Sequence, residues 1–116
     1  MDSKIRDLVK AATEKSLREK LKWHAIDSEA FRTQLGTGRL VILRTIAELT
    51  SGNAYRYSVS ITDQTGREVA EAYAVEGVDH DSDVEELQKL FEASRTAAFG
   101  GHQLIDTMLK ELETIP

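Results

Sequence analysis

Cysteine is absent from this chain of 116 residues. The absence excludes disulfide bonds, thiol catalysis and thiolate metal sites, and it is typical of a protein in a reducing cytoplasm. The sequence also lacks any apolar run close to the roughly 20 residues that a membrane-spanning helix needs. Its first residues have no uninterrupted apolar core, so we expect no secretory signal. These absences predict a cytoplasmic protein with no membrane partner.

Motifs that would mark an active site are missing as well. The glycine pair Gly100 and Gly101 fits neither the dinucleotide fingerprint nor the phosphate loop. A calcium loop beginning at Asp79 fails because Val84 and Leu90 stand where glycine and glutamate are required. The histidines form no paired zinc motif, and no serine lies in a nucleophile elbow. We therefore predict no catalytic residue, no cofactor and no metal. The sequence favours a protein that is not an enzyme.

The net charge of −5 is unevenly distributed along the chain. Residues 1–22 carry seven Lys or Arg against four Asp or Glu, whereas residues 79–116 carry three against nine. An acidic protein is a poor partner for nucleic acid, because neutralising phosphates requires a basic surface. We therefore expect no nucleic-acid partner. The unlike ends can be paired between two copies of the chain or within one copy, and the sequence leaves both arrangements open.

Both ends of the chain have a helical period. Apolar or small side chains recur every three or four residues in the first segment, which predicts a helix with Ser3 as its N-cap. In the last segment Ser82 and Glu85 have the spacing of a capping box. The apolar stripe that follows passes Gly100 without a change of phase. We therefore favour one long helix over residues 83–113, in preference to a break at the glycines.

The middle of the chain has the period of strands. Residues 55–62 alternate strictly between apolar and polar side chains, which predicts a half-buried strand. The turn at residues 63–66 leads to a return strand, and the glycines in residues 36–38 predict a second hairpin. Residues 48–54 are expected to form a loop between the two hairpins. A short strand near residues 22–26 precedes them.

The alternation in residues 68–75 can be placed on the sheet in two ways. In the preferred placement, the alanines lie beneath the helices while Glu71 and Tyr73 face outward beside Arg56 and Arg44. In the other placement Glu71 is buried and needs a partner such as an arginine.

The stretch from the tryptophan onward resembles small bacterial proteins of uncharacterised function. Their pattern is a first helix, then W…D-x-F-x-T-x-L-x-x-G, a Y-x-x-x-I-x-D-x-x-G hairpin and a long terminal helix. The residues that carry the resemblance are Trp23, Asp27 or Ser28, Phe31, Thr33, Leu35, Gly38, Tyr57, Ile61, Asp63 and Gly66. The resemblance implies a bacterial origin and a helix–meander–helix layout, and it brings no catalytic residue.

These patterns predict a single α+β domain over residues 1–116. We expect an antiparallel sheet of four or five strands, with the N-terminal helix and the long C-terminal helix packed on one face. The other face would stay partly open. The candidate interaction surface comprises Trp23, Arg32, Val41, Leu43 and Arg56. Trp23 has two interpretations, a cap on the core or an anchor for a partner.

Two classes of function fit the sequence. The favoured class is a non-catalytic interaction or regulatory module, of an adaptor, chaperone-like or immunity type, that binds a protein partner and forms a homodimer. The alternative is a small-molecule-binding domain or a small enzyme with its site between the sheet and the C-terminal helix.

Overall fold

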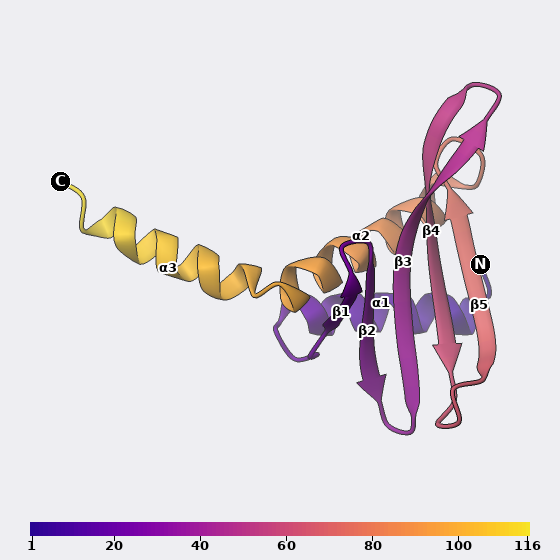
Figure 1. Ribbon diagram of the computed structural model, residues 1–116, viewed down its shortest axis with the longest axis horizontal. Coiled ribbons are helices and arrows are strands. Elements are labelled where there is room, and N and C mark those ends of the chain that lie inside the picture. The colour runs from indigo at the N-terminus through magenta and orange to yellow at the C-terminus, as the bar shows by residue number, and fades with distance from the viewer.

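A computed structural model describes all 116 residues and shows an α+β arrangement (Figure 1). The predicted fold class and the antiparallel sheet are confirmed. None of the helices is long and apolar enough to cross a membrane. In chain order the elements are α1 (Ser3–Leu17), β1 (His24–Asp27), β2 (Ala30–Leu35), β3 (Gly38–Leu49), β4 (Gly52–Thr62), β5 (Glu68–Val75), α2 (Asp81–Ala98) and α3 (Gly101–Glu113).

The five strands form one antiparallel meander in the order β1-β2-β3-β4-β5. Both predicted hairpins are present, and so is the short first strand. The loop expected over residues 48–54 is instead a tight turn, because β3 continues to Leu49 and β4 already begins at Gly52. The β3–β4 hairpin therefore extends beyond its neighbours at one end of the sheet (Figure 1).

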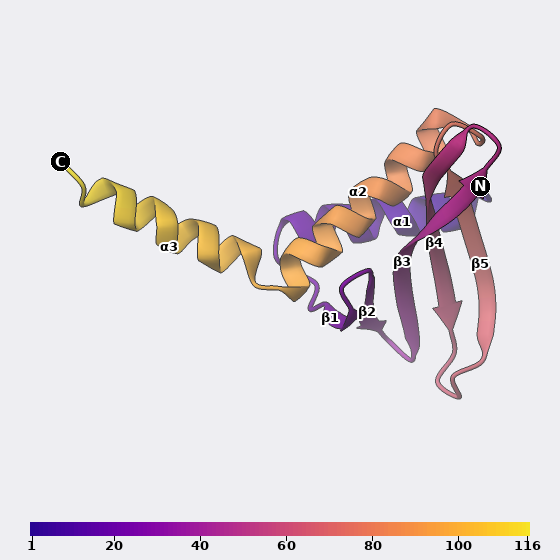
Figure 2. The same cartoon turned by 45° about the horizontal axis from the view of Figure 1, so that its top comes forward.

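One face of the sheet, here called the inner face, is covered by α2, with α1 beside it (Figure 2). Successive side chains of a strand point to opposite faces, so Leu40 and Ile42 lie in the core while Val41 lies on the other side. Phe91 of α2 meets the rings of Phe31 and Tyr57 edge to face, with centroids 5.6 and 5.9 Å apart. Such aromatic contacts bury much apolar area and hold α2 on the sheet.

The alanines of β5 face the helices, as preferred from the sequence. Ala74 is fully buried, whereas Tyr73 is 55% exposed on the opposite face. Arg44 departs from the expected placement, because it shares the parity of the buried residues of β3 and points inward. Its Nε donates to Glu29 at 2.7 Å, and its guanidinium lies 4.6 Å from the Phe91 ring centre. The hydrogen bond to Glu29 raises the pKa of Arg44.

The helix starts differ from those predicted. Asp2, not Ser3, is the N-cap of α1, and its carboxylate accepts hydrogen bonds from two backbone amides. Helix α2 begins at Asp81 with His80 as its N-cap, and no side chain caps it. The capping box expected at Ser82 is therefore wrong, because the helix starts before the serine and leaves it inside the first turn.

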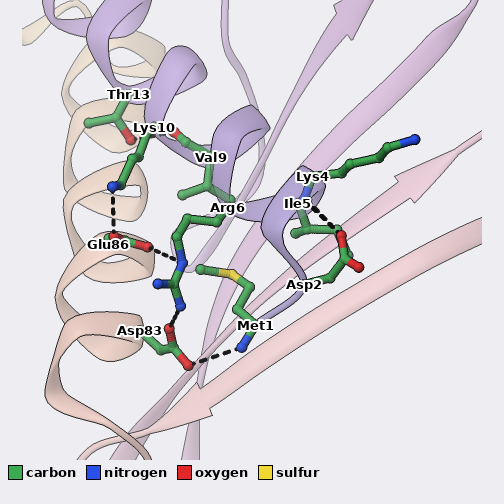
Figure 3. Close-up of polar contacts among 10 residues, drawn as sticks. All are labelled: Met1, Asp2, Lys4, Ile5, Arg6, Val9, Lys10, Thr13, Asp83 and Glu86. Atoms are coloured by element: carbon green, nitrogen blue, oxygen red, sulfur yellow. Dashed lines mark hydrogen bonds and ion pairs between the residues drawn. The ribbon is translucent and has the colours of Figure 1, made fainter.

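The basic start of α1 is paired with the acidic start of α2 inside the same chain (Figure 3). The guanidinium of Arg6 and the α-amino group of Met1 both contact the Asp83 carboxylate, the amine at 3.2 Å. Glu86 lies 3.3 Å from Arg6 Nε and 3.4 Å from the Lys10 amine. These contacts pair part of the basic start with part of the acidic end within one copy.

Replacing Asp83 by asparagine should lower the free energy of unfolding by about 1–2 kcal/mol. The Asp83 side chain is only 13% exposed, so its loss leaves two cationic groups with less compensation than a surface pair would. Asp81→Asn is the matched control, because Asp81 is exposed in the same turn and makes no ion pair. Urea denaturation of both variants measures the difference, and equal losses would contradict a specific role for Asp83.

Candidate interaction surface

A sharp elbow separates α2 from α3, so the single long helix predicted over residues 83–113 is wrong. Gly100 has a φ of +69°, in the left-handed region that favours glycine, and its amide donates to the Ala97 carbonyl at 3.3 Å. At Gly101 an added Cβ would lie 2.8 Å from the Thr96 methyl carbon. The first glycine ends the helix, and the second lets α3 start close against α2.

Beyond the elbow α3 projects away from the sheet and from the other two helices (Figures 1 and 2). None of its 13 residues is buried. Its apolar side chains nevertheless gather on one side, because their spacing follows the 3.6-residue turn. We call this side the α3 apolar face, and its members are 53–63% exposed: Leu104, Ile105, Met108, Leu109, Leu112 and Ile115, which lies two residues beyond the end of the helix. Glu111 and Glu113 flank it on its two sides.

The second exposed surface is the side of the sheet opposite to α1 and α2, here called the outer sheet face. Residues that lie opposite each other in the antiparallel register share a face. One row across the sheet is Arg32, Val41, Ser60 and Glu71, and the next is Ala30, Leu43, Ser58 and Tyr73.

Four of the five residues predicted for the interaction surface therefore lie together on the outer sheet face. They are Arg32, Val41, Leu43 and Arg56. The Arg56 guanidinium lies 4.0 Å from the centre of the Tyr73 ring, which keeps its charge at the surface of the face.

Trp23, the fifth predicted residue, lies elsewhere. Its side chain is 4% exposed in the core, and its indole nitrogen donates to the Ser16 hydroxyl at 2.7 Å. The sequence left open whether Trp23 caps the core or anchors a partner. In the structure it joins the end of α1 to the sheet, and it does not share a surface with the four outer residues.

The elbow borders a hollow of about 540 Å³ that contains the only contact between a histidine and a carboxylate. His102 Nδ1 lies 4.0 Å from the Glu19 carboxylate, and the other ring nitrogen is covered and has no hydrogen-bond partner. Glu19 follows α1 with a left-handed φ of +58°. The Lys20 amide donates to the Lys15 carbonyl, so this backbone closes the helix in a Schellman turn. The left-handed backbone at Glu19 is therefore explained by its place in this helix-ending turn.

Other polar clusters are already satisfied within the chain. At the end of the β4–β5 hairpin, Asp63 accepts hydrogen bonds from the Thr65 hydroxyl and from the Thr65 and Arg67 amides. The Thr65 hydroxyl bond is the largest cause of a lowered pKa of Asp63. Nowhere does the fold bring together three or more His, Cys, Asp or Glu residues that could hold a metal ion.

The space between the inner face and α2 is where the alternative function placed a small-molecule site. The rings of Phe31, Tyr57 and Phe91 fill it, and all three are at most 2% exposed. Burial raises the pKa of Tyr57, so its hydroxyl stays protonated at neutral pH.

The α3 apolar face was absent from the residues singled out in the sequence. The sequence predicts its stripe as the continuation of the stripe of α2, along one helix packed on the sheet. Composition does not separate the two, because large apolar residues such as Leu87 and Phe91 precede the glycines just as Met108 and Leu112 follow them.

The sequence matches no protein-family model, no curated protein and no solved structure. The resemblance to small bacterial proteins therefore has no matching family behind it and transfers no function.

Replacing Gly100 by alanine should straighten the elbow. Alanine in the left-handed region costs about 1–2 kcal/mol, and alanine in a helix gains about 1 kcal/mol over glycine. Because the chain has no cysteine, spin labels can be attached at Glu92→Cys and Glu111→Cys. We expect their distance to lengthen toward the roughly 28 Å of a continuous helix.

The matched control is Gln103→Ala, which changes an exposed residue inside α3. It should leave the label distance as in the parent protein. Labelled chains are diluted with unlabelled ones, so that only distances within one chain are recorded. An unchanged distance in Gly100→Ala would show that the elbow does not depend on the left-handed glycine.

Proposed function

We propose that this chain is a non-catalytic protein-interaction module that self-associates through the α3 apolar face. The observation that carries the proposal is a helix of 13 residues with a full apolar side and no buried residue. Isolated helices of about 12–15 residues are marginally stable in water. A helix with this composition is expected to gain its stability from a surface that covers it.

The gain from covering α3 is substantial. Fully burying a side chain such as leucine or methionine is worth about 1.5–3 kcal/mol. The members of the α3 apolar face are 53–63% exposed, so about 1 kcal/mol per side chain is still available. Summed over the apolar side chains of two helices, this gain is of the size needed to offset the translational and rotational freedom that two chains lose when they associate.

The chemistry of the remaining surface supports binding rather than catalysis. The elbow hollow holds one histidine–carboxylate contact, and its lining contains Lys20 and Lys22 but no cysteine or serine. By contrast, α3 offers a continuous apolar surface with a charged border, which is typical of helices that dock on a partner.

Met108→Asp should weaken self-association at least about thirtyfold, because a carboxylate would be forced into the covered apolar contact. Folding should be unaffected, since Met108 is 54% exposed and α3 has no buried residue. Sedimentation velocity over a range of concentrations measures the dissociation constant, and thermal unfolding checks the fold.

Thr107→Asp is the matched control, because Thr107 lies on the polar side of the same helix. Its dissociation constant should stay within about threefold of that of the parent protein. A parent protein with the mass of one chain at every concentration would refute the proposal. So would a Met108→Asp variant that associates as the parent does.

A further inference from the structure

We infer that the surface that receives α3 is the outer sheet face of a second copy of this chain, with each copy giving its helix to the other. This inference rests on the proposed self-association through α3 and specifies where the helix binds. It joins the two exposed surfaces of the molecule, the α3 apolar face and the outer sheet face, into one interface.

The helix cannot reach the outer face of its own sheet. Helix α2 covers the inner face, and only Phe99 and Gly100 connect it to α3. Two residues span at most about 7 Å. A helix on the opposite face would lie roughly 20 Å away, across the sheet and the two side-chain layers. The occupant of the outer face must therefore come from another molecule.

The charges of the two surfaces complement each other. The outer sheet face carries the arginines Arg32, Arg39 and Arg56, and the acids in the rows of Arg32 and Arg39 are Glu71 and Glu68. None of these arginines forms an ion pair within the chain. On α3, Glu111 and Glu113 are likewise without an ion-pair partner. Unpaired acids beside one surface and unpaired arginines on the other favour their association.

The apolar residues and the dimensions of the outer sheet face also match those of α3. Val41 and Leu43 on β3 and Tyr73 on β5 lie on either side of the small Ser58 and Ser60 of β4. These serines let a helix approach the middle of the sheet closely. Helix α3 is about 20 Å long, which is close to the roughly 19 Å between the outermost of five strands.

A second candidate for receiving α3 is the groove between α1 and α2, but its charge disfavours the helix. Among its lining residues, Glu14, Glu85 and Glu86 outnumber Lys10 and Lys89. Lys10 is moreover already paired with Glu86 at 3.4 Å. An acidic helix placed there would meet an acidic groove, whereas the outer sheet face offers it cations.

A reciprocal exchange closes the assembly at two copies. Each chain presents the same donor helix and the same acceptor face, so a twofold axis satisfies both surfaces on both chains. In such a dimer the helix that projects from one body lies on the sheet of the other. The sheet then has a helical layer on each side.

Charge reversal tests the inference on the full-length chain. We expect Arg32→Glu with Arg56→Glu to weaken the dimer about tenfold or more, and Glu111→Lys with Glu113→Lys to do the same. A chain that carries all four substitutions should recover the parent dissociation constant to within about threefold, because the interaction between the two surfaces is restored. Lys4→Glu with Lys15→Glu makes the same change of charge on exposed positions of α1 and should have no effect.

The outcomes separate this inference from the proposed function. A dimer that Met108→Asp disrupts, but that the two sheet substitutions leave unchanged, would place α3 on another surface and overturn the inference alone. Tighter association of Glu111→Lys with Glu113→Lys would indicate the acidic groove and would also overturn it. A parent protein that stays monomeric would overturn both. Circular dichroism of each variant confirms that it remains folded.

Discussion

The left-handed backbone at Gly100 is the constraint on which the rest of the structure depends. It ends α2 after the helix has covered the inner face of the sheet, and it turns α3 away from the body. A continuous helix would carry the same apolar residues in another direction. Because a single residue leaves the helical region, a short stretch of chain produces both a complete core and an uncovered helix.

The sheet, α1 and α2 form a packed core to which α3 contributes no buried residue. The aromatic contacts of Phe91 hold α2 on the sheet, and the ion pairs around Asp83 and Glu86 hold α1 against α2. These contacts pair part of the basic start of the sequence with part of its acidic end inside one chain. Glu111 and Glu113 on α3 and the three arginines of the outer sheet face are among the charges that remain without an ion pair, and they are the basis of the proposed dimer.

Much of the fold could be predicted because strands and turns have recognisable patterns over a few neighbouring residues. Alternation placed Val41 and Leu43 on one face and Leu40 and Ile42 on the other. The elbow could not be predicted in this way, since the phase of an apolar stripe counts residues and does not record a change in direction. The left-handed φ of Gly100 adds no residue to the count, so the stripe continues unbroken across the turn.

The outer sheet face was predicted in part for the same reason. The outer positions of the strands follow from alternation, which brought Arg32, Val41, Leu43 and Arg56 to one face. Trp23 could not be assigned from sequence, because a tryptophan at the junction of a helix and a sheet can face either way. Its burial is decided by the hydrogen bond to Ser16 and by the space beneath α2.

Amide hydrogen exchange of residues 101–113 at increasing protein concentration tests the central claim most directly. If a second copy covers α3, its amides become protected as the concentration rises, while the amides of β3 and β4 are protected throughout. Protection should appear over the same range of concentration in which sedimentation detects the dimer. Rapid exchange of α3 at every concentration, beside a protected sheet, would contradict the account.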